Sequence, residues 1–337
     1  MLDVIHWAIF TIENNSKINI NKRINMNNFK KIGLSALAGS LVAFSVNAAE
    51  MSVSGAAGFS LTSTGETTAS AFGQNDSVTI SGSGETDGGL SITASFELDG
   101  DDSMDDRSFT VGSDTIGTFT FSGHGGSSVM GGWDDVVPHA YEEPWAMTAE
   151  AADDVVNGIS GTNLMRYDSP VVSGASVHVA YQDAAQTATA STYTDFGIKV
   201  SPEMVEGLEL GYAEGSYDTT ATLSTDESTM YVKYTMGSVS VGYQTSEINA
   251  GTAATTDETV SASISYAVSD DISISYGTHT VDFGDVATDQ ESSGFSASYT
   301  MGGMTLKGYM NSADNVAGAT AATADRESYE LSLSFAF

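Results

Sequence analysis

The chain has 337 residues and no cysteine, and its 11 Lys and Arg residues face 44 Asp and Glu residues, which gives a formal net charge of -33. A chain of this length can form one large domain, and without cysteine no disulfide bond can stabilise it. The strong negative charge excludes nucleic acid as a partner, because its phosphates would be repelled.

The beginning of the chain has the pattern of a targeting segment. The basic pair Lys30 and Lys31 precedes an apolar run at 32–46, and the small residues typical of a cleavage site end at Ala48. This order of features predicts a signal peptide over 26–48 that is cleaved after Ala48.

Residues 1–25 are then either an upstream extension that is not part of the mature protein or a genuine extended presequence. The predicted mature chain, 49–337, keeps 6 basic and 42 acidic residues, so its net charge is 6 − 42 = -36. Such a chain attracts cations.

The mature chain consists of predicted strands almost throughout. We expect strands at 50–62, 69–83, 90–98, 107–113, 117–125, 163–169, 175–182, 194–200, 207–216, 228–236, 239–247, 259–268, 271–281, 291–301, 304–312 and 328–337. Apolar residues alternate with small or polar ones at a period of two. The alternation is clearest in the last strand, where Tyr329, Leu331, Leu333, Phe335 and Phe337 share one face.

The connections between these strands differ in length. Tight turns are predicted at 236–238, 269–271 and 301–303. The long, polar connections of the second half are 217–228, 247–258, 283–291 and 311–327. Alternation of short and long connections is typical of an up-and-down barrel with short periplasmic turns and longer external loops.

The distribution of side chains favours a membrane barrel over a soluble secreted β protein. Both show alternating strands. Here, however, Ser, Thr and Gly dominate one face, and aromatic residues such as Tyr266, Tyr276 and Tyr299 collect near strand ends. No apolar stretch of the mature chain approaches the roughly 18 residues of a spanning helix. We therefore predict an all-β fold, a transmembrane up-and-down antiparallel β-barrel with 16 strands.

Several segments resemble the general Gram-negative bacterial porins. The ending 331–337 is similar to the terminal strand of bacterial outer-membrane proteins, and 163–170 resembles the porin hairpin that follows the constriction loop. Upstream, 107–112 and 117–123 resemble the two strands that lead into this loop. One departure is His124, which stands where the family usually has arginine.

The resemblance implies a channel in the outer membrane of a Gram-negative bacterium. It implies that a long third loop, at about 126–162, folds into the lumen and narrows it. It also implies a homotrimer in outer-membrane lipid, and recognition of the terminal strand, which ends in Phe337, by the barrel assembly machinery.

The predicted constriction loop is acidic and contains no Lys or Arg, but has Trp133 and Trp145. Its candidate constriction residues are Asp134, Asp135, Glu142 and Glu143. If they face the lumen, they concentrate cations and oppose anions. The alternative is that they cover the solvent face of the loop, as runs of acidic residues usually do.

Candidates for the pore wall come from parity and from the resemblance. Parity with outward apolar neighbours directs His124, His178, Lys199 and Lys233 inward, along with Lys307, Glu97 and Glu209. The resemblance adds Arg107 and Arg166 as cations at the constriction. Each of these arginines could instead be a strand-end residue tied to neighbouring acids.

No motif for catalysis, phosphate binding or zinc binding is present, so we expect neither an enzyme nor a cofactor. We expect no formed metal site, and at most loosely held Ca²⁺ or Mg²⁺ at the acidic external loops.

The predicted function is passive diffusion of small hydrophilic solutes and ions through a water-filled, cation-preferring porin. A substrate-specific channel and a plugged structural or adhesive barrel are the alternatives.

Overall fold

The computed structural model describes residues 50–64, 70–100, 103–146, 156–183, 192–220, 223–251, 256–321 and 324–337. The predicted upstream extension and signal peptide, 1–48, lie outside the described residues. In the part of the chain that is described, no helix is long and apolar enough to cross a membrane.

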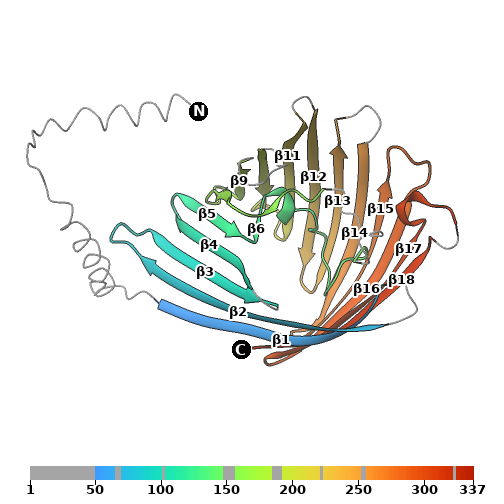
Figure 1. Cartoon of the computed structure of the whole chain (residues 1–337), viewed down its shortest axis with the longest axis horizontal. Helices are drawn as coiled ribbons and strands as arrows, with labels where there is room; N and C mark the ends of the chain where they lie inside the picture. Colours follow the sequence, from blue (N-terminus) through green and yellow to red (C-terminus); the bar gives the residue numbers. More distant parts are fainter. Residues whose placement is uncertain are drawn as a thin grey trace, which may run out of the picture. The chain divides into compact units, whose positions relative to one another are not determined.

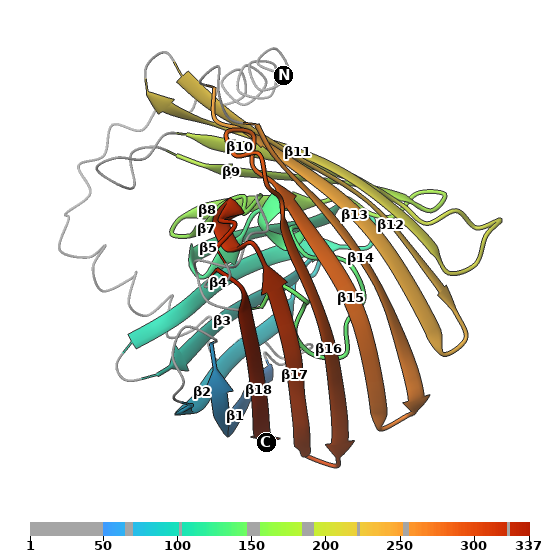
Figure 2. The ribbon, with the colours of Figure 1, turned by 90° about the vertical axis from the view of Figure 1, so that its right-hand side faces the viewer.

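Sixteen antiparallel strands form one closed barrel (Figures 1 and 2). They are β1 (Glu50–Ser63), β2 (Ala71–Glu85), β3 (Ser91–Asp99), β4 (Ser103–Ser113), β5 (Gly117–His124), β8 (Leu164–Asp168), β9 (Ala175–Gln182), β10 (Tyr193–Val200), β11 (Leu208–Thr220), β12 (Leu223–Met236), β13 (Val239–Asn249), β14 (Thr256–Ser269), β15 (Ile272–Asp282), β16 (Gln290–Met301), β17 (Met304–Asp314) and β18 (Arg326–Ala336). Two short strands, β6 (Gly126–Ser127) and β7 (Ser160–Gly161), pair only with each other.

All sixteen predicted strands are confirmed, but one predicted connection is wrong. The long polar connection expected at 217–228 belongs largely to strands, because β11 and β12 continue as a paired hairpin to Thr220 and Leu223. The ladder needs only backbone groups, and Ser216 adds a side-chain hydrogen bond to Asp226 at 2.8 Å. A strand can therefore continue where its apolar alternation has stopped.

The two faces of the barrel have opposite chemistry. Large apolar side chains are exposed on the outer face, as at Phe59, Ile264 and Leu331. Neighbouring polar residues on the other face, such as Ser261 and Ser296, are buried. An apolar exterior around a polar interior suits lipid outside and water inside.

The barrel closes between its first and last strands. The amide of Phe337 donates to the carbonyl of Gly55 at 2.9 Å, and the amide of Gly55 donates back to Phe337 at 2.9 Å. The Phe337 ring lies against Gly55 so closely that an added Cβ would meet it at 2.8 Å. Closure leaves no barrel strand with an unpaired edge.

Candidate functional site

The segment between β5 and β8 lies against the polar face of the strands (Figure 1). The structure describes this segment except for residues 147–155. The described residues make hydrogen bonds to side chains around more than half of the barrel. The backbone amide of Met130 donates to Asp195 at 2.8 Å, and that of Val136 donates to Gln244 at 3.0 Å. The amides of Ala140 and Tyr141 donate to Ser275 at 2.9 Å and to Ser296 at 3.1 Å, respectively. Asn311 donates to the carbonyl of Glu143 at 2.8 Å. These bonds follow the wall from β10 to β17.

Glycines on this wall leave room for the bulky residues of the loop. A Cβ added to Gly197 of β10 would lie 2.7 Å from the Trp133 ring, and one added to Gly277 of β15 would lie 2.7 Å from Pro144. Pro138 occupies the space above Gly242 of β13. Close approach of this kind is possible only without a side chain on the strand.

The four acidic residues predicted for the constriction lie on this bound loop and are all half-buried. The carbonyl of Asp134 accepts a hydrogen bond from Gln244 at 2.9 Å, which fixes the backbone at the start of the acidic stretch. Glu142 and Glu143 follow Tyr141, whose hydroxyl donates to Glu330 of β18 at 2.8 Å. The acidic stretch is thus tied to the wall at both ends.

Asp135, His139 and Glu143 form a compact cluster in this stretch. One ligand atom from each of the three lies within 4.8 Å of the others. Burial lowers the pKa of His139, but the adjacent Asp135 and the charges of Glu143 and Glu142 outweigh it, so the pKa is raised overall. Burial, together with the charge of Asp135, raises the pKa of Glu143 to about 7.

Arg166 and His178 meet at one carboxylate, that of Asp168. Arg166 binds Asp168 with Nε at 3.1 Å and Nη2 at 3.0 Å, and its Nη1 donates to the carbonyl of Ser128 in the loop at 3.0 Å. His178 lies 2.5 Å from the same Asp168 carboxylate and meets the Trp133 ring edge-on. Arg166 therefore holds the loop, and an acid lies directly against it.

Lys199 and Lys233 lie beside a second acid of the wall, Glu209. Nζ of Lys233 lies 3.3 Å from Glu209, and Nζ of Lys199 lies 3.9 Å from the same carboxylate. Lys307 lies over the ring of Tyr141 in the loop, 4.1 Å from its centroid. These lysines, like Arg166, are on the wall that the loop follows.

The register contradicts the expectation that Arg107 and His124 line the pore. Arg107 pairs with Phe96 and shares its face of β4 with Phe109, both exposed on the apolar side. The register of β4 and β5 shifts between Arg107 and Ser108, so that His124 pairs with Arg107 and does not continue the regular alternation of β5. The bulge at Gly123 could not be seen in the alternation pattern, because the pattern assumes a regular ladder.

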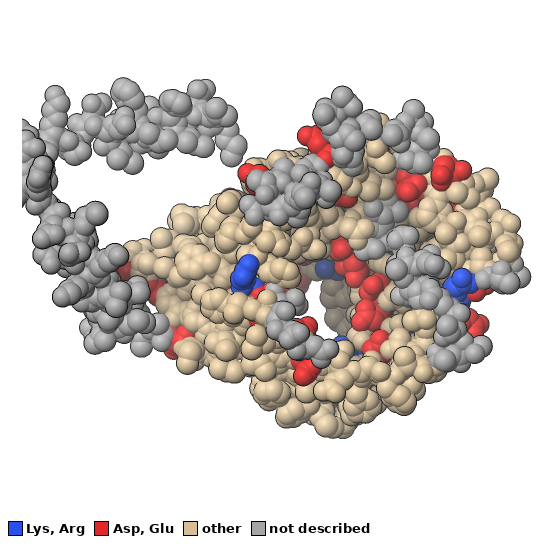
Figure 3. Space-filling view, viewed as in Figure 1, with Lys and Arg blue, Asp and Glu red and all other residues tan. Residues whose placement is uncertain are grey.

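The wall formed by β1 to β5 differs from the wall that carries the loop. Its polar face carries mainly serines and threonines, including Ser81 hydrogen-bonded to Ser95 at 3.0 Å, together with Glu97, which pairs with Thr79. Arg107 is the one Lys or Arg in the sequence 50–124, and it faces the other way. The space-filling view shows an opening through the barrel with acidic side chains along one edge (Figure 3).

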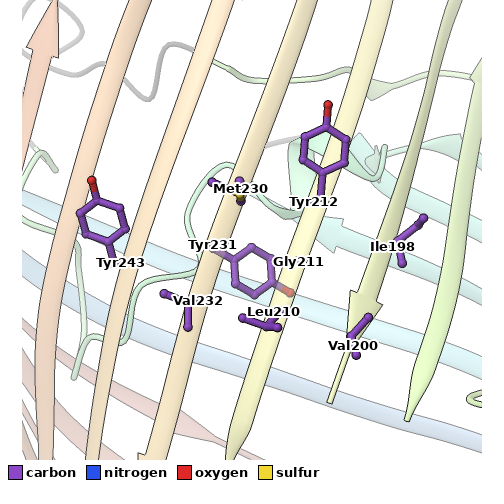
Figure 4. A pocket seen from close by; sticks show the side chains of 9 residues that line it. All are labelled: Ile198, Val200, Leu210, Gly211, Tyr212, Met230, Tyr231, Val232 and Tyr243. Atoms are coloured by element: carbon purple, nitrogen blue, oxygen red, sulfur yellow. The ribbon is translucent and has the colours of Figure 1, made fainter. Parts of the chain in front are cut away.

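A second hollow, of about 470 Å³, lies on the outer face between β10 and β13 (Figure 4). Its lining is apolar and includes Leu210, Met230 and Val232. Such an apolar lining is unsuited to a hydrophilic solute.

Sequence reasoning missed the residues that hold the loop. Asp195 and Gln244 are buried polar side chains that bind loop backbone, and His139 belongs to the acidic cluster. A signal was present in Gly197 and Gly277, which occupy positions of polar parity where a strand would otherwise carry a side chain.

Comparisons with known proteins agree with this architecture. The model of the family described as Gram-negative porin matches residues 33–305. No curated protein matches the sequence significantly.

Solved structures match the fold over most of the chain. An anion-selective porin from Comamonas acidovorans is 14% identical, with a TM-score of 0.65, covering 86% of this chain and 100% of that one. The trimer form of OmpT, an outer membrane protein of Vibrio cholerae, is 12% identical, with a TM-score of 0.63, covering 86% and 99%. At these identities the likeness establishes the fold.

The family match spans most of the chain, and the closed barrel has the architecture that the match requires. Membership of this family makes the protein a channel of the outer membrane. The chain belongs to the Gram-negative porin family.

Proposed function

We propose that this porin passes small hydrophilic solutes and prefers cations, with the loop between β5 and β8 forming the constriction. The observation that carries the proposal is the position of the interior cations. Arg166, Lys199 and Lys233 lie on the wall that the loop follows, each within 4 Å of an acid. Solutes then pass between the acidic loop and the wall of β1 to β5.

Charge at this passage is strongly one-sided. The loop contributes four carboxyl groups between Asp134 and Glu143, and the facing strands contribute Ser and Thr on their polar side. A narrow passage lined by one sign of charge concentrates the opposite ion and raises a barrier to like ions. An acidic lining therefore favours K⁺ over Cl⁻.

The Comamonas relative is described as anion-selective. Opposite selectivity on the same fold is reasonable, because selectivity depends on the few charges at the narrowest point.

The alternative functions have less support. A specific sugar channel would need a row of free aromatic side chains. The inward tyrosines instead contact acids or the loop. Tyr193 donates to Asp195 at 3.2 Å, and Tyr231 donates to Glu209 at 3.2 Å. The ring centroid of Tyr309 lies 6.2 Å from that of Tyr141 in the loop. The opening in Figure 3 argues against a plugged barrel.

The partners follow from the same proposal. We expect a homotrimer, as in the trimer form of the Vibrio relative, embedded in outer-membrane lipid. We expect the strand ending in Phe337 to be recognised by the barrel assembly machinery. The acidic external loops would hold Ca²⁺ or Mg²⁺ only loosely, and no cofactor is needed for diffusion.

The test is the reversal potential of the folded protein in a planar bilayer under a KCl gradient. Wild type is compared with the combined variant Asp134→Asn, Asp135→Asn, Glu142→Gln and Glu143→Gln. We expect K⁺ preference in the wild type and a several-fold lower permeability ratio in the variant.

A matched control neutralises four acids near one external loop, Asp282, Asp285, Asp289 and Glu291. If the control lowers the K⁺ preference as much as the loop variant, selectivity arises at the mouth and not at the constriction. Anion preference in the wild type would reject the proposal outright.

A further inference from the structure

The cluster of Asp135, His139 and Glu143 has the composition of a metal site. The three residues are spaced four apart in a single stretch of the loop. Their ligand atoms lie within 4.8 Å of one another, and all three side chains are half-buried. Three ligands around one ion at about 2.0–2.2 Å lie roughly 3–4 Å apart, so small side-chain rotations bring this set to bonding geometry.

The donor set indicates which cation fits. Ca²⁺ and Mg²⁺ select oxygen ligands, whereas an imidazole nitrogen beside two carboxylates suits first-row transition metals. Three protein ligands leave coordination positions open for water. Catalytic zinc sites have the same arrangement, with water or substrate in the open position.

A second observation concerns an atom without a partner. Nδ1 of His139 is buried, yet it makes no hydrogen bond to any residue that the structure describes. The other ring nitrogen, Nε2, pairs with Oδ1 of Asp135 at 2.9 Å. Buried polar atoms normally have partners, and a metal ion would provide one.

The surrounding backbone holds the cluster in place before any ion binds. Ser263 donates to the carbonyl of Pro138 at 2.7 Å, and the amide of Ala140 donates to Ser275 at 2.9 Å. Both bonds flank His139. The ring of Trp145 lies 6.4 Å from the ring of His139, close enough to report on an ion bound there.

We propose that Asp135, His139 and Glu143 bind a divalent first-row transition-metal cation at the constriction loop. Crowding of acids at this point supports the assignment, because a bound cation offsets the repulsion between Asp135 and Glu143. The binding itself does not depend on the proposed channel function. Its effect on ion flow does, since a bound divalent ion adds positive charge where K⁺ would pass.

The test is a titration of the folded, detergent-solubilised protein with Co²⁺, in which quenching of Trp fluorescence measures binding. Excess Mg²⁺ is present throughout to occupy the oxygen-only sites of the acidic surface. We expect saturable quenching at one ion per chain. Loss of even an outer-shell partner weakens metal sites by about 10–100-fold, so His139→Gln is expected to weaken Co²⁺ binding at least tenfold.

His124→Gln is the matched control, because it removes an imidazole outside the cluster, at the end of β5 where His124 pairs with Arg107. It should bind Co²⁺ as tightly as the wild type. Glu143→Gln is a second ligand variant, and heat-modifiable gel mobility establishes that each barrel is folded. Equal Co²⁺ affinity in wild type and His139→Gln, or quenching that never saturates, would overturn the proposal.

A conductance measurement separates this proposal from the proposed function. If Co²⁺ binds at one ion per chain but K⁺ current is unchanged, the metal site stands and the loop does not form the constriction. If K⁺ preference is present but Co²⁺ does not bind, the porin proposal stands and the metal site is rejected.

Discussion

The two walls of the barrel interior differ in what they carry. The wall from β8 to β18 carries the interior lysines and Arg166, with the acids that pair with them. It also holds the loop through buried polar side chains such as Asp195 and Gln244. The wall from β1 to β5 presents Ser and Thr, and its one arginine faces outward. The interior cations of this chain therefore lie on the wall that carries the loop and not on the wall that faces it.

Placing a cation on the open wall should have the largest effect. Ser95 lies on the polar side of β3, hydrogen-bonded to Ser81 across the ladder. We expect Ser95→Arg to lower the K⁺ to Cl⁻ permeability ratio several-fold and to reduce conductance, because it restores a positive charge opposite the acidic loop. Reversal potential and single-channel current are the measurements.

Ser95→Gln controls for the size of the new side chain and for the lost hydrogen bond. Identical selectivity in the Arg and Gln variants would mean that the passage does not run along this wall.

Loosening the loop from the opposite wall should have an intermediate effect. Gln244 is buried, accepts a hydrogen bond from the Val136 amide and donates to the carbonyls of Trp133 and Asp134. Gln244→Ala removes all three bonds, which at about 0.5–1.5 kcal/mol each amounts to roughly 2–4 kcal/mol of attachment. We expect larger fluctuations of the open-channel current.

The comparison variant is Gln74→Ala, at an exposed position of β2. A channel as quiet in Gln244→Ala as in Gln74→Ala would show that the remaining bonds suffice to hold the loop.

The smallest effect is expected at Arg107. Because its side chain shares the outer face with Phe96 and Phe109, Arg107→Gln should leave the reversal potential unchanged. A measurable shift toward cations in this variant would return Arg107 to the pore and weaken the contrast between the walls.

The alternation pattern was sufficient to predict the barrel. A strand in a barrel repeats every two residues, and this local rule located all sixteen strands. It failed for His124, at the bulge of Gly123 beside Arg107. The prediction that Arg107 is a cation at the constriction came from the resemblance to porins and not from the alternation.

The support of the loop could not be predicted in the same way. Asp195 and Gln244 lie far from Met130 and Val136 in the sequence, and no periodicity links a loop residue to a particular strand. The cluster around His139 depends on how the loop backbone bends, because a strand or an extended loop would separate residues four apart.

Closure by Phe337 has a consequence for the time course of assembly. Ala56 pairs with Ala336, which is 336 − 56 = 280 positions later in the chain. The first strand must therefore remain without one neighbour until the final residues have been synthesised. Contacts so distant in sequence form slowly, and an open sheet edge can meanwhile pair with another chain. A barrel fastened by its last residue thus needs protection throughout its biogenesis, and a truncated chain would retain two reactive edges.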